Sequence, residues 1–152
     1  MVGNDVVINS GVHNLKLNEH FDFIRDFEFI EEQNCAVRTR FGFLIGDRDI
    51  WWSLAEPNLP EILKDSILKV ILPFLDSMHS YALMERFLTD AAVEKKHYPP
   101  PIIYLALLRS ELGQKVSACS LLMNLRAATS SPWQKRIDDL MEKLDCKKLL
   151  TS

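Results

Sequence analysis

The sequence has no long hydrophobic run and no excess of basic residues. Its longest apolar stretches, VILPFL and IIYLALL, are far shorter than the roughly 20 residues that a membrane-spanning helix needs. With 18 Lys and Arg against 21 Asp and Glu, no basic excess remains to bind a nucleic-acid backbone. The N-terminus, MVGNDVVINS, lacks the basic start and apolar core of a signal peptide. We therefore expect a soluble cytoplasmic protein that binds neither nucleic acid nor a membrane.

Cysteine and catalytic motifs are scarce as well. The three cysteines, Cys35, Cys119 and Cys146, are far apart and odd in number, which favours reduced thiols over a disulfide framework. The four histidines show no metal-ligand spacing. There is no Gly-x-Ser-x-Gly motif, no P-loop and no Gly-x-Gly-x-x-Gly turn, so the usual signatures of hydrolases, nucleotide hydrolases and dinucleotide oxidoreductases are missing. We expect no metal and no cofactor, and we assign no catalytic residue.

The chain has the size of one domain. Its 152 residues, 47% of them hydrophobic, suffice for a core without metals or cross-links. We therefore predict a single domain over residues 1–152, with residues 1–56 mainly in strands and residues 58–146 mainly in helices.

The N-terminal third shows strand patterns. The run DVVINSGVH is rich in β-branched residues and predicts a strand. The next segment, residues 17–34, fits both a strand and a helix, and we leave it open. From Cys35 to Leu44 apolar and polar residues alternate as on a strand with one buried face. Gly46, Asp47 and Asp49 then favour a turn before the strand-forming IWWSL. These signals together predict an antiparallel hairpin.

From Asn58 onward the pattern becomes helical. Asn58 is a candidate cap for a first helix that Pro73 should end or kink near Leu72. A second helix should follow Ser80, and Gly113 should separate two more. That pair has the spacing of a tetratricopeptide unit, but no second copy occurs at a 34-residue offset, so we interpret it as a helical pair closing a core. A last helix should follow a cap at position 131. The fold class is α+β: a small antiparallel sheet packed against four to five C-terminal helices.

The order of these patterns resembles a bacterial family known as domain of unknown function 4304. The resemblance covers about Val6 to Leu88 and is carried by an Asn-x-Gly strand, a Cys-x-x-Arg-x-Arg strand, a Trp-Trp pair and a Pro-Phe-Leu after the first helix. The matching positions are Asn9, Gly11, Cys35, Arg38, Arg40, Gly42, Trp51, Trp52, Pro73, Phe74 and Leu75. The resemblance implies a fold but no activity. Family members usually begin with a helix and further strands that are not found here, so either the sequence is truncated or the sheet is smaller and has an exposed edge.

The charged residues around the predicted turn are the main candidates for a site. Arg38 and Arg40 should lie on one strand face, about 7 Å apart, where they could clamp a phosphate or a carboxylate. They could equally pair with Asp47 and Asp49 in a solvated salt-bridge ladder. The two aspartates alone also resemble a metal-binding pair, although such pairs are common in turns.

The adjacent tryptophans should point to opposite faces of a strand. One of Trp51 and Trp52 would then be buried between sheet and helices, and the other exposed or covered by a helix. An exposed tryptophan flanked by arginines has the composition of an interface hot spot.

Two functions remain open at this level. The first is a non-enzymatic domain that binds another protein or a small ligand, for example an immunity or antitoxin-like protein. The alternative is an unrecognised enzyme that holds an anionic small substrate with Arg38 and Arg40 and uses Asp47 or Asp49 as acid or base. The candidate binding residues are the same in both: Arg38, Arg40, Asp47, Asp49, Trp51 and Trp52. An exposed sheet edge also predicts a homodimer formed by strand pairing.

Overall fold

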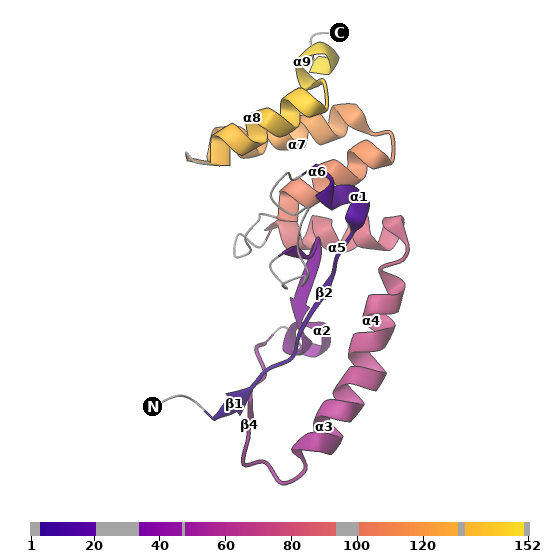
Figure 1. Ribbon diagram of the computed structural model, residues 1–152, viewed down its shortest axis with the longest axis vertical. Coiled ribbons are helices and arrows are strands. Elements are labelled where there is room, and N and C mark those ends of the chain that lie inside the picture. Colours follow the sequence, from indigo (N-terminus) through magenta and orange to yellow (C-terminus); the bar gives the residue numbers. More distant parts are fainter. Residues whose placement is uncertain (1–3, 21–33, 47, 94–100, 131–132, 151–152) are drawn as a thin grey trace.

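The computed structural model describes residues 4–20, 34–46, 48–93, 101–130 and 133–150. The fold class is α+β, as predicted, with short antiparallel strand pairs in the N-terminal part and helices after them. Figure 1 shows an elongated molecule: the strands and one long helix form one end, and the remaining helices stack at the other.

The strands form two short antiparallel pairs along one extended segment. Strands β1 (Asp5–Val6) and β2 (Asn9–Val12) both lie in residues 4–12. Strand β1 pairs with β4 (Trp52–Ser53), whereas β2 pairs with β3 (Val37–Arg40). The predicted hairpin is therefore wrong, since β3 and β4 do not pair with each other but lie one after the other along residues 4–12. The described residues between them, 41–46 and 48–51, loop out.

The predicted strand from Cys35 to Leu44 is too long. Only β3 is extended, and the chain continues directly into helix α2 (Phe41–Gly46). The turn is held by the N–H of Phe41, which donates to the carbonyl oxygen of Ile8 at 3.0 Å. It also needs a glycine, because a Cβ on Gly42 would lie 2.0 Å from the carbonyl oxygen of Arg48. As a result Phe41 is buried and Phe43 is exposed, although strand alternation would bury both.

The first long helix does not end near Leu72, but its regular α-helical geometry is interrupted just before that residue. Helix α3 (Leu59–Ser66) continues through a π-helical turn, η3 (Ile67–Ile71), into α4 (Leu72–Ser77). In the π-helical turn the N–H of Leu72 donates to the carbonyl oxygen of Ile67, five residues earlier, and this wider turn accommodates Pro73, which has no N–H. Asn58 occupies the N-cap position, but its side chain makes no capping hydrogen bond.

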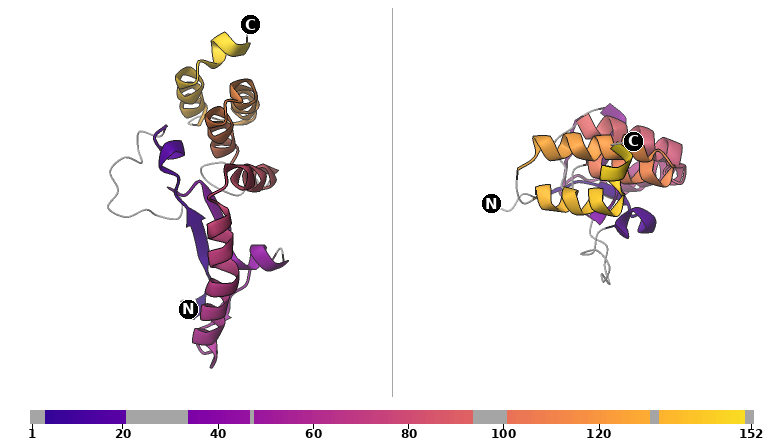
Figure 2. Two further views of the ribbon diagram at one scale, coloured as in Figure 1. Left: turned by 90° about the vertical axis from the view of Figure 1, so that its right-hand side faces the viewer. Right: turned by 90° about the horizontal axis from the view of Figure 1, so that it is seen from above.

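The other helices stack on one another above the long helix. Figures 1 and 2 show them crossing the molecular axis in successive layers. They are α5 (Tyr81–Val93), α6 (Pro101–Glu111), α7 (Lys115–Ala128), α8 (Trp133–Lys143) and α9 (Cys146–Leu150), with the short α1 (Leu15–Asn18) beside α6. The start of α5 after Ser80 and the break at Gly113 are confirmed. Gly113 has a φ of 80°, the left-handed conformation that favours glycine.

The main hydrophobic core lies within this stack. Its fully buried side chains include Tyr104, Leu107, Leu122 and Ile137. Cys119 of α7 and Cys146 of α9 are joined by a disulfide, so the expectation of three thiols is wrong for these two and correct for Cys35, which is free and buried. Helix α8 folds back on α7 and brings the two cysteines, 27 residues apart in sequence, to a Cα–Cα distance of 5.3 Å.

Within the described ranges, no single helix combines the length and apolar character needed to cross a membrane. One pair, Leu59–Ser77 with Tyr81–Asp90, meets those two criteria only when taken together, and it is bent by 106°.

Candidate functional site

The strand register determines which face the two candidate arginines occupy. Arg40 lies opposite Asn9 and Arg38 opposite Gly11, while Thr39 lies opposite Ser10. Thr39 and Ser10 are buried, whereas both arginines are half-buried. Because cross-strand partners share a face, Arg38, Arg40, Asn9 and Gly11 lie together on the face opposite the buried pair.

Arg40 forms the centre of a small surface cluster. Its guanidinium makes an ion pair with Asp49 and lies over the ring of Trp51, 5.5 Å from the ring centre. Trp51 is 52% exposed. The cation–π contact and the ion pair together hold the three side chains in one arrangement on the surface. The structure thus brings Arg40, Asp49 and Trp51 together, while Asp47 lies outside the described residues.

Trp52 takes part in a separate contact. It lies opposite Val6 in the β1–β4 pair, and its ring packs against Phe41 with the ring centres 5.4 Å apart. It is half-buried, in contrast to its exposed neighbour. Of the two tryptophans, Trp52 therefore helps to hold α2 against the strands, and Trp51 is the one presented to solvent.

The charge of Arg38 acts on Tyr104 in the helical stack. Burial raises the pKa of Tyr104 in α6 to about 12, and the positive charge of Arg38 counteracts this rise while Cys35 adds to it. Cys35 also packs over Gly11, where a Cβ would lie 2.8 Å from the cysteine sulfur. The two arginines share a strand face, but their electrostatic partners are different.

Exposed apolar side chains occur close in sequence to the Arg40 cluster, on α2 and directly after β4. Phe43 and Ile45 lie on α2, and Leu54 directly follows β4. Their exposed fractions are 44%, 52% and 60%. Sequence reasoning missed them because the alternating pattern placed Phe43 in a strand and Ile45 in a turn. We call Arg40, Asp49, Trp51, Phe43, Ile45 and Leu54 the Trp51 surface.

A shallow cavity lies elsewhere, on the long helix. It has a volume of about 580 Å³ and is open to solvent. Its lining consists of Leu68, Leu72, Pro73, Leu75, Asp76 and His79. None of the sequence-predicted site residues lines it, so this cavity does not connect the arginines or tryptophans to a binding pocket.

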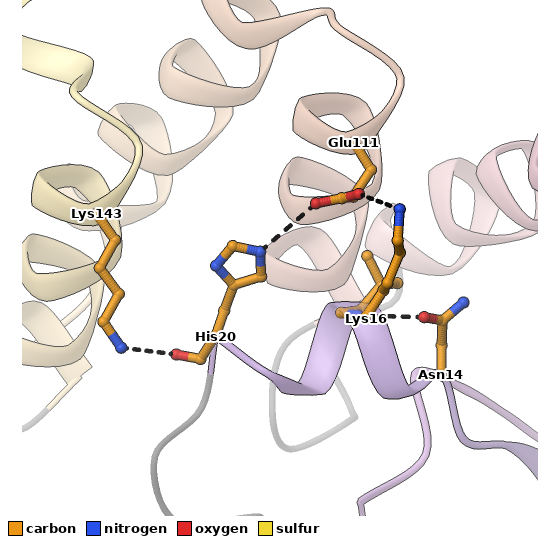
Figure 3. Close-up of polar contacts among 6 residues, drawn as sticks. Asn14, Lys16, His20, Glu111 and Lys143 are labelled. Atoms are coloured by element: carbon orange, nitrogen blue, oxygen red, sulfur yellow. Dashed lines mark hydrogen bonds and ion pairs between the residues drawn. The ribbon is translucent and has the colours of Figure 1, made fainter.

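A second polar cluster joins α1 to the helical stack (Figure 3). Glu111 of α6 accepts a hydrogen bond from Lys16 Nζ at 3.2 Å and lies 3.8 Å from His20 Nε2. Lys143 of α8 donates to the backbone carbonyl of His20 at 3.2 Å. The hydrogen bond to Glu111 raises the pKa of Lys16, which keeps the lysine cationic. These contacts link three elements, and we interpret the cluster as a structural clamp.

The described part of the chain contains no group of three or more His, Cys, Asp or Glu side chains placed to hold a metal ion. His13 is half-buried, and its burial lowers the pKa of the imidazole. His79 is an exposed residue whose Nδ1 lies 2.7 Å from the carbonyl oxygen of Asp76, at the end of α4. His97 lies outside the described residues.

Residues 2–76 match a family model described as "Domain of unknown function (DUF4304)". These residues resemble the DUF4304 family. The resemblance predicted from the sequence is thus confirmed, and we call residues 2–76 the DUF4304 region. It contains both strand pairs, α2 and nearly all of the long helix, together with Arg40, Asp49 and Trp51. Helices α5–α9 lie beyond the matched residues.

Searches of curated proteins and of solved structures gave no match to this chain. The DUF4304 description itself names no activity.

Proposed function

We propose that this chain is a non-enzymatic protein-binding domain that holds a partner protein on the Trp51 surface. The observation that carries the proposal is an exposed tryptophan fixed in place: Trp51 is 52% exposed, and Arg40, itself held by Asp49, covers its ring. Tryptophan and arginine are enriched among the residues that dominate binding energy at interfaces. An anchor that is already ordered loses little conformational entropy when a partner binds.

The apolar residues around Trp51 support the same proposal. Phe43, Ile45 and Leu54 expose large side chains next to it in sequence. A neighbouring group of such residues on a monomer is typical of an interaction surface. Each 100 Å² of apolar surface that a partner covers contributes about 2.5 kcal/mol to the free energy of binding. The entropy lost on association and the desolvation of polar groups must be subtracted from this value. The partner that fits this surface is a folded protein with an apolar patch of its own.

The alternative of an enzyme acting on an anionic substrate has less support. Arg40 already has a carboxylate partner, Asp49, within the chain. Arg38 exerts its charge on Tyr104, and the cavity of about 580 Å³ on α4 includes neither arginine. A substrate anion would have to displace Asp49, whereas a protein partner can pack on Trp51 with the ion pair intact. An antitoxin-like role would be a special case of the protein binding proposed here.

The first experiment is affinity capture of the tagged full chain from a lysate of the organism that encodes it, with quantitative mass spectrometry. Wild type is compared with Trp51→Ala and with Met123→Ala. Met123 is 44% exposed on α7, outside the DUF4304 region, so it is a matched control for loss of an exposed apolar side chain. We expect one protein to be recovered stoichiometrically with wild type and Met123→Ala and lost with Trp51→Ala.

Calorimetry with the purified partner then measures the effect. A hot-spot residue contributes at least about 2 kcal/mol, so Trp51→Ala should weaken binding roughly 30-fold, while Met123→Ala should leave the Kd within about threefold. Failure to recover any stoichiometric partner, or an affinity that Trp51→Ala leaves unchanged, would contradict the proposal.

A further inference from the structure

The extended segment of residues 4–12 has one paired edge and one open edge. The N–H of Leu54 donates to Asn4 and the N–H of Phe41 donates to Ile8, at 2.6 and 3.0 Å. In antiparallel pairing the backbone groups alternate between the two edges. The even-numbered residues therefore direct their N–H and C=O groups toward β4 and β3. Those of the odd-numbered residues, Asp5, Val7, Asn9 and Gly11, point to the opposite edge.

This opposite edge is unpaired within the described part of the chain. Among the described strands, β1 has β4 as its one neighbour and β2 has β3. Both strand pairs are two-stranded, with β1 and β2 at their edges. In Figure 1 the segment crosses the lower half of the molecule from β1 to α1 as one extended stretch. An open edge of this length is a template for a further strand.

The spacing of these four residues fits a second copy of the same edge. In an antiparallel pair centred on Ile8, Asp5 lies opposite Gly11 of the second copy, and Val7 lies opposite Asn9. The same pairs recur on the other side of the two-fold axis, so every outward backbone group of the four residues acquires a partner in both copies. An isologous interface of this kind closes on itself as a dimer.

The side chains are compatible with this register. Gly11 lies opposite Arg38 within one chain, so Asp5 of the second copy would lie on the same face as Arg38, two strands and about 10 Å away. The Cys35 side chain fills the space above Gly11, so the carboxylate of the exposed Asp5 and the guanidinium of Arg38 attract each other across that side chain without direct contact. At the axis the two half-buried Ile8 side chains would meet, adding an apolar contact.

We propose that this chain forms a two-fold symmetric dimer through antiparallel pairing of residues 4–12 with the same residues of a second copy, in the register that centres on Ile8. The proposal goes beyond the partner-binding function, because it involves a backbone edge and not the Trp51 surface. The two proposals can therefore fail independently.

Light scattering coupled to size exclusion tests the dimer on the purified chain alone. The mass should rise from the 17.5 kDa of one chain toward twice that value as the concentration increases from about 1 µM to 1 mM. A mass that stays at 17.5 kDa over the whole range would overturn the proposal.

Cysteine cross-linking tests the register. In the proposed pairing the two Ile8 residues lie directly opposite each other in a non-hydrogen-bonded position, with Cα atoms about 4.5 Å apart, within disulfide range. Ile8→Cys should therefore yield a covalent dimer with oxidised glutathione on a non-reducing gel. Val6→Cys is the matched control, because two Val6 residues would be about 13 Å apart along the strands, beyond the reach of a disulfide. Equal cross-linking of both variants, or none with Ile8→Cys, would exclude this register.

Discussion

The DUF4304 region and the C-terminal helices bury their apolar residues to very different degrees. In the stack, side chains such as Leu107, Leu108 and Leu122 are 0% exposed. In the DUF4304 region many large hydrophobic side chains lie at the surface: Leu15, Phe43, Ile45, Trp51, Leu54, Ile67, Leu68 and Leu72. Two-stranded pairs with one long helix beside them cannot enclose both of their faces, whereas stacked helices cover one another. The region that resembles the DUF4304 family therefore leaves more of its large apolar side chains at the surface than the core of the helical stack does.

The largest change in the free energy of unfolding should come from a substitution in the core of the helical stack. Leu107→Ala removes a fully buried side chain from α6 and should lower the free energy of unfolding by about 2–5 kcal/mol. Leu68→Ala, at a position 51% exposed on η3, should change it by less than about 0.5 kcal/mol. Urea denaturation of the two variants measures both values. If both substitutions lower the free energy of unfolding by the same amount, the difference in burial does not translate into a difference in stability.

A somewhat smaller effect is expected where the two parts meet, at Tyr104. The ordinary tyrosine pKa is about 10, and burial raises that of Tyr104 to about 12. Between these values the unfolded chain loses a phenolic proton that the folded chain keeps, so stability falls as the pH rises from 10 to 12, by about 2–3 kcal/mol.

Tyr104→Phe removes this contribution. The stability difference between wild type and Tyr104→Phe should therefore be constant below pH 9 and shift in favour of the variant by about 2–3 kcal/mol near pH 12. Parallel denaturation curves at each pH measure the shift. Identical pH dependence of both proteins would show that Tyr104 ionises as freely in the folded chain as in the unfolded one.

The smallest effect should occur within the DUF4304 region, at two glycines of α2. Gly42→Ala places a Cβ 2.0 Å from the carbonyl oxygen of Arg48 and should cost about 1–3 kcal/mol, as overpacking typically does. Gly46→Ala meets nothing within 4 Å and should be neutral or stabilising by up to about 1 kcal/mol. Thermal denaturation, followed by tryptophan fluorescence, measures the stability of both variants. A tolerated Gly42→Ala would mean that residues 41–51 can rearrange.

The sequence predicted the parts of this fold that depend on local chemistry. Gly113 separates two helices because glycine tolerates a φ of 80°, and this can be inferred from its neighbours in the sequence alone. The alternation that placed Arg38 and Arg40 on one face of β3 is equally local. The end of that strand was missed because it depends on a distant contact: Phe41 bonds to Ile8, and Gly42 packs against Arg48.

Other errors also have non-local causes. A proline has no N–H and usually interrupts an α-helix. Here the π-helical turn before Pro73 lets the helix continue, and such a turn cannot be predicted from the residue pattern. The pairing of Cys119 with Cys146 depends on how α8 folds back on α7, which spacing does not reveal. In the candidate site, the aspartate expected to pair with an arginine does so in the case of Arg40 and Asp49. The exposure of Phe43 and Ile45 was not predicted, because it depends on residues 41–46 forming a helix.

The disulfide between Cys119 and Cys146 also changes the connectivity of the chain. The covalent bond turns residues 119–146 into a closed ring that includes all of α8. A single proteolytic cut within this ring would not release a fragment, because both new ends stay attached through the sulfur atoms. The C-terminal helix α9 is likewise tied to α7 at its first residue, so it cannot detach from α7 at that residue while the bond persists. Residues before Cys119 have no such tether through this bond, and a cut there would divide the chain into two separable pieces.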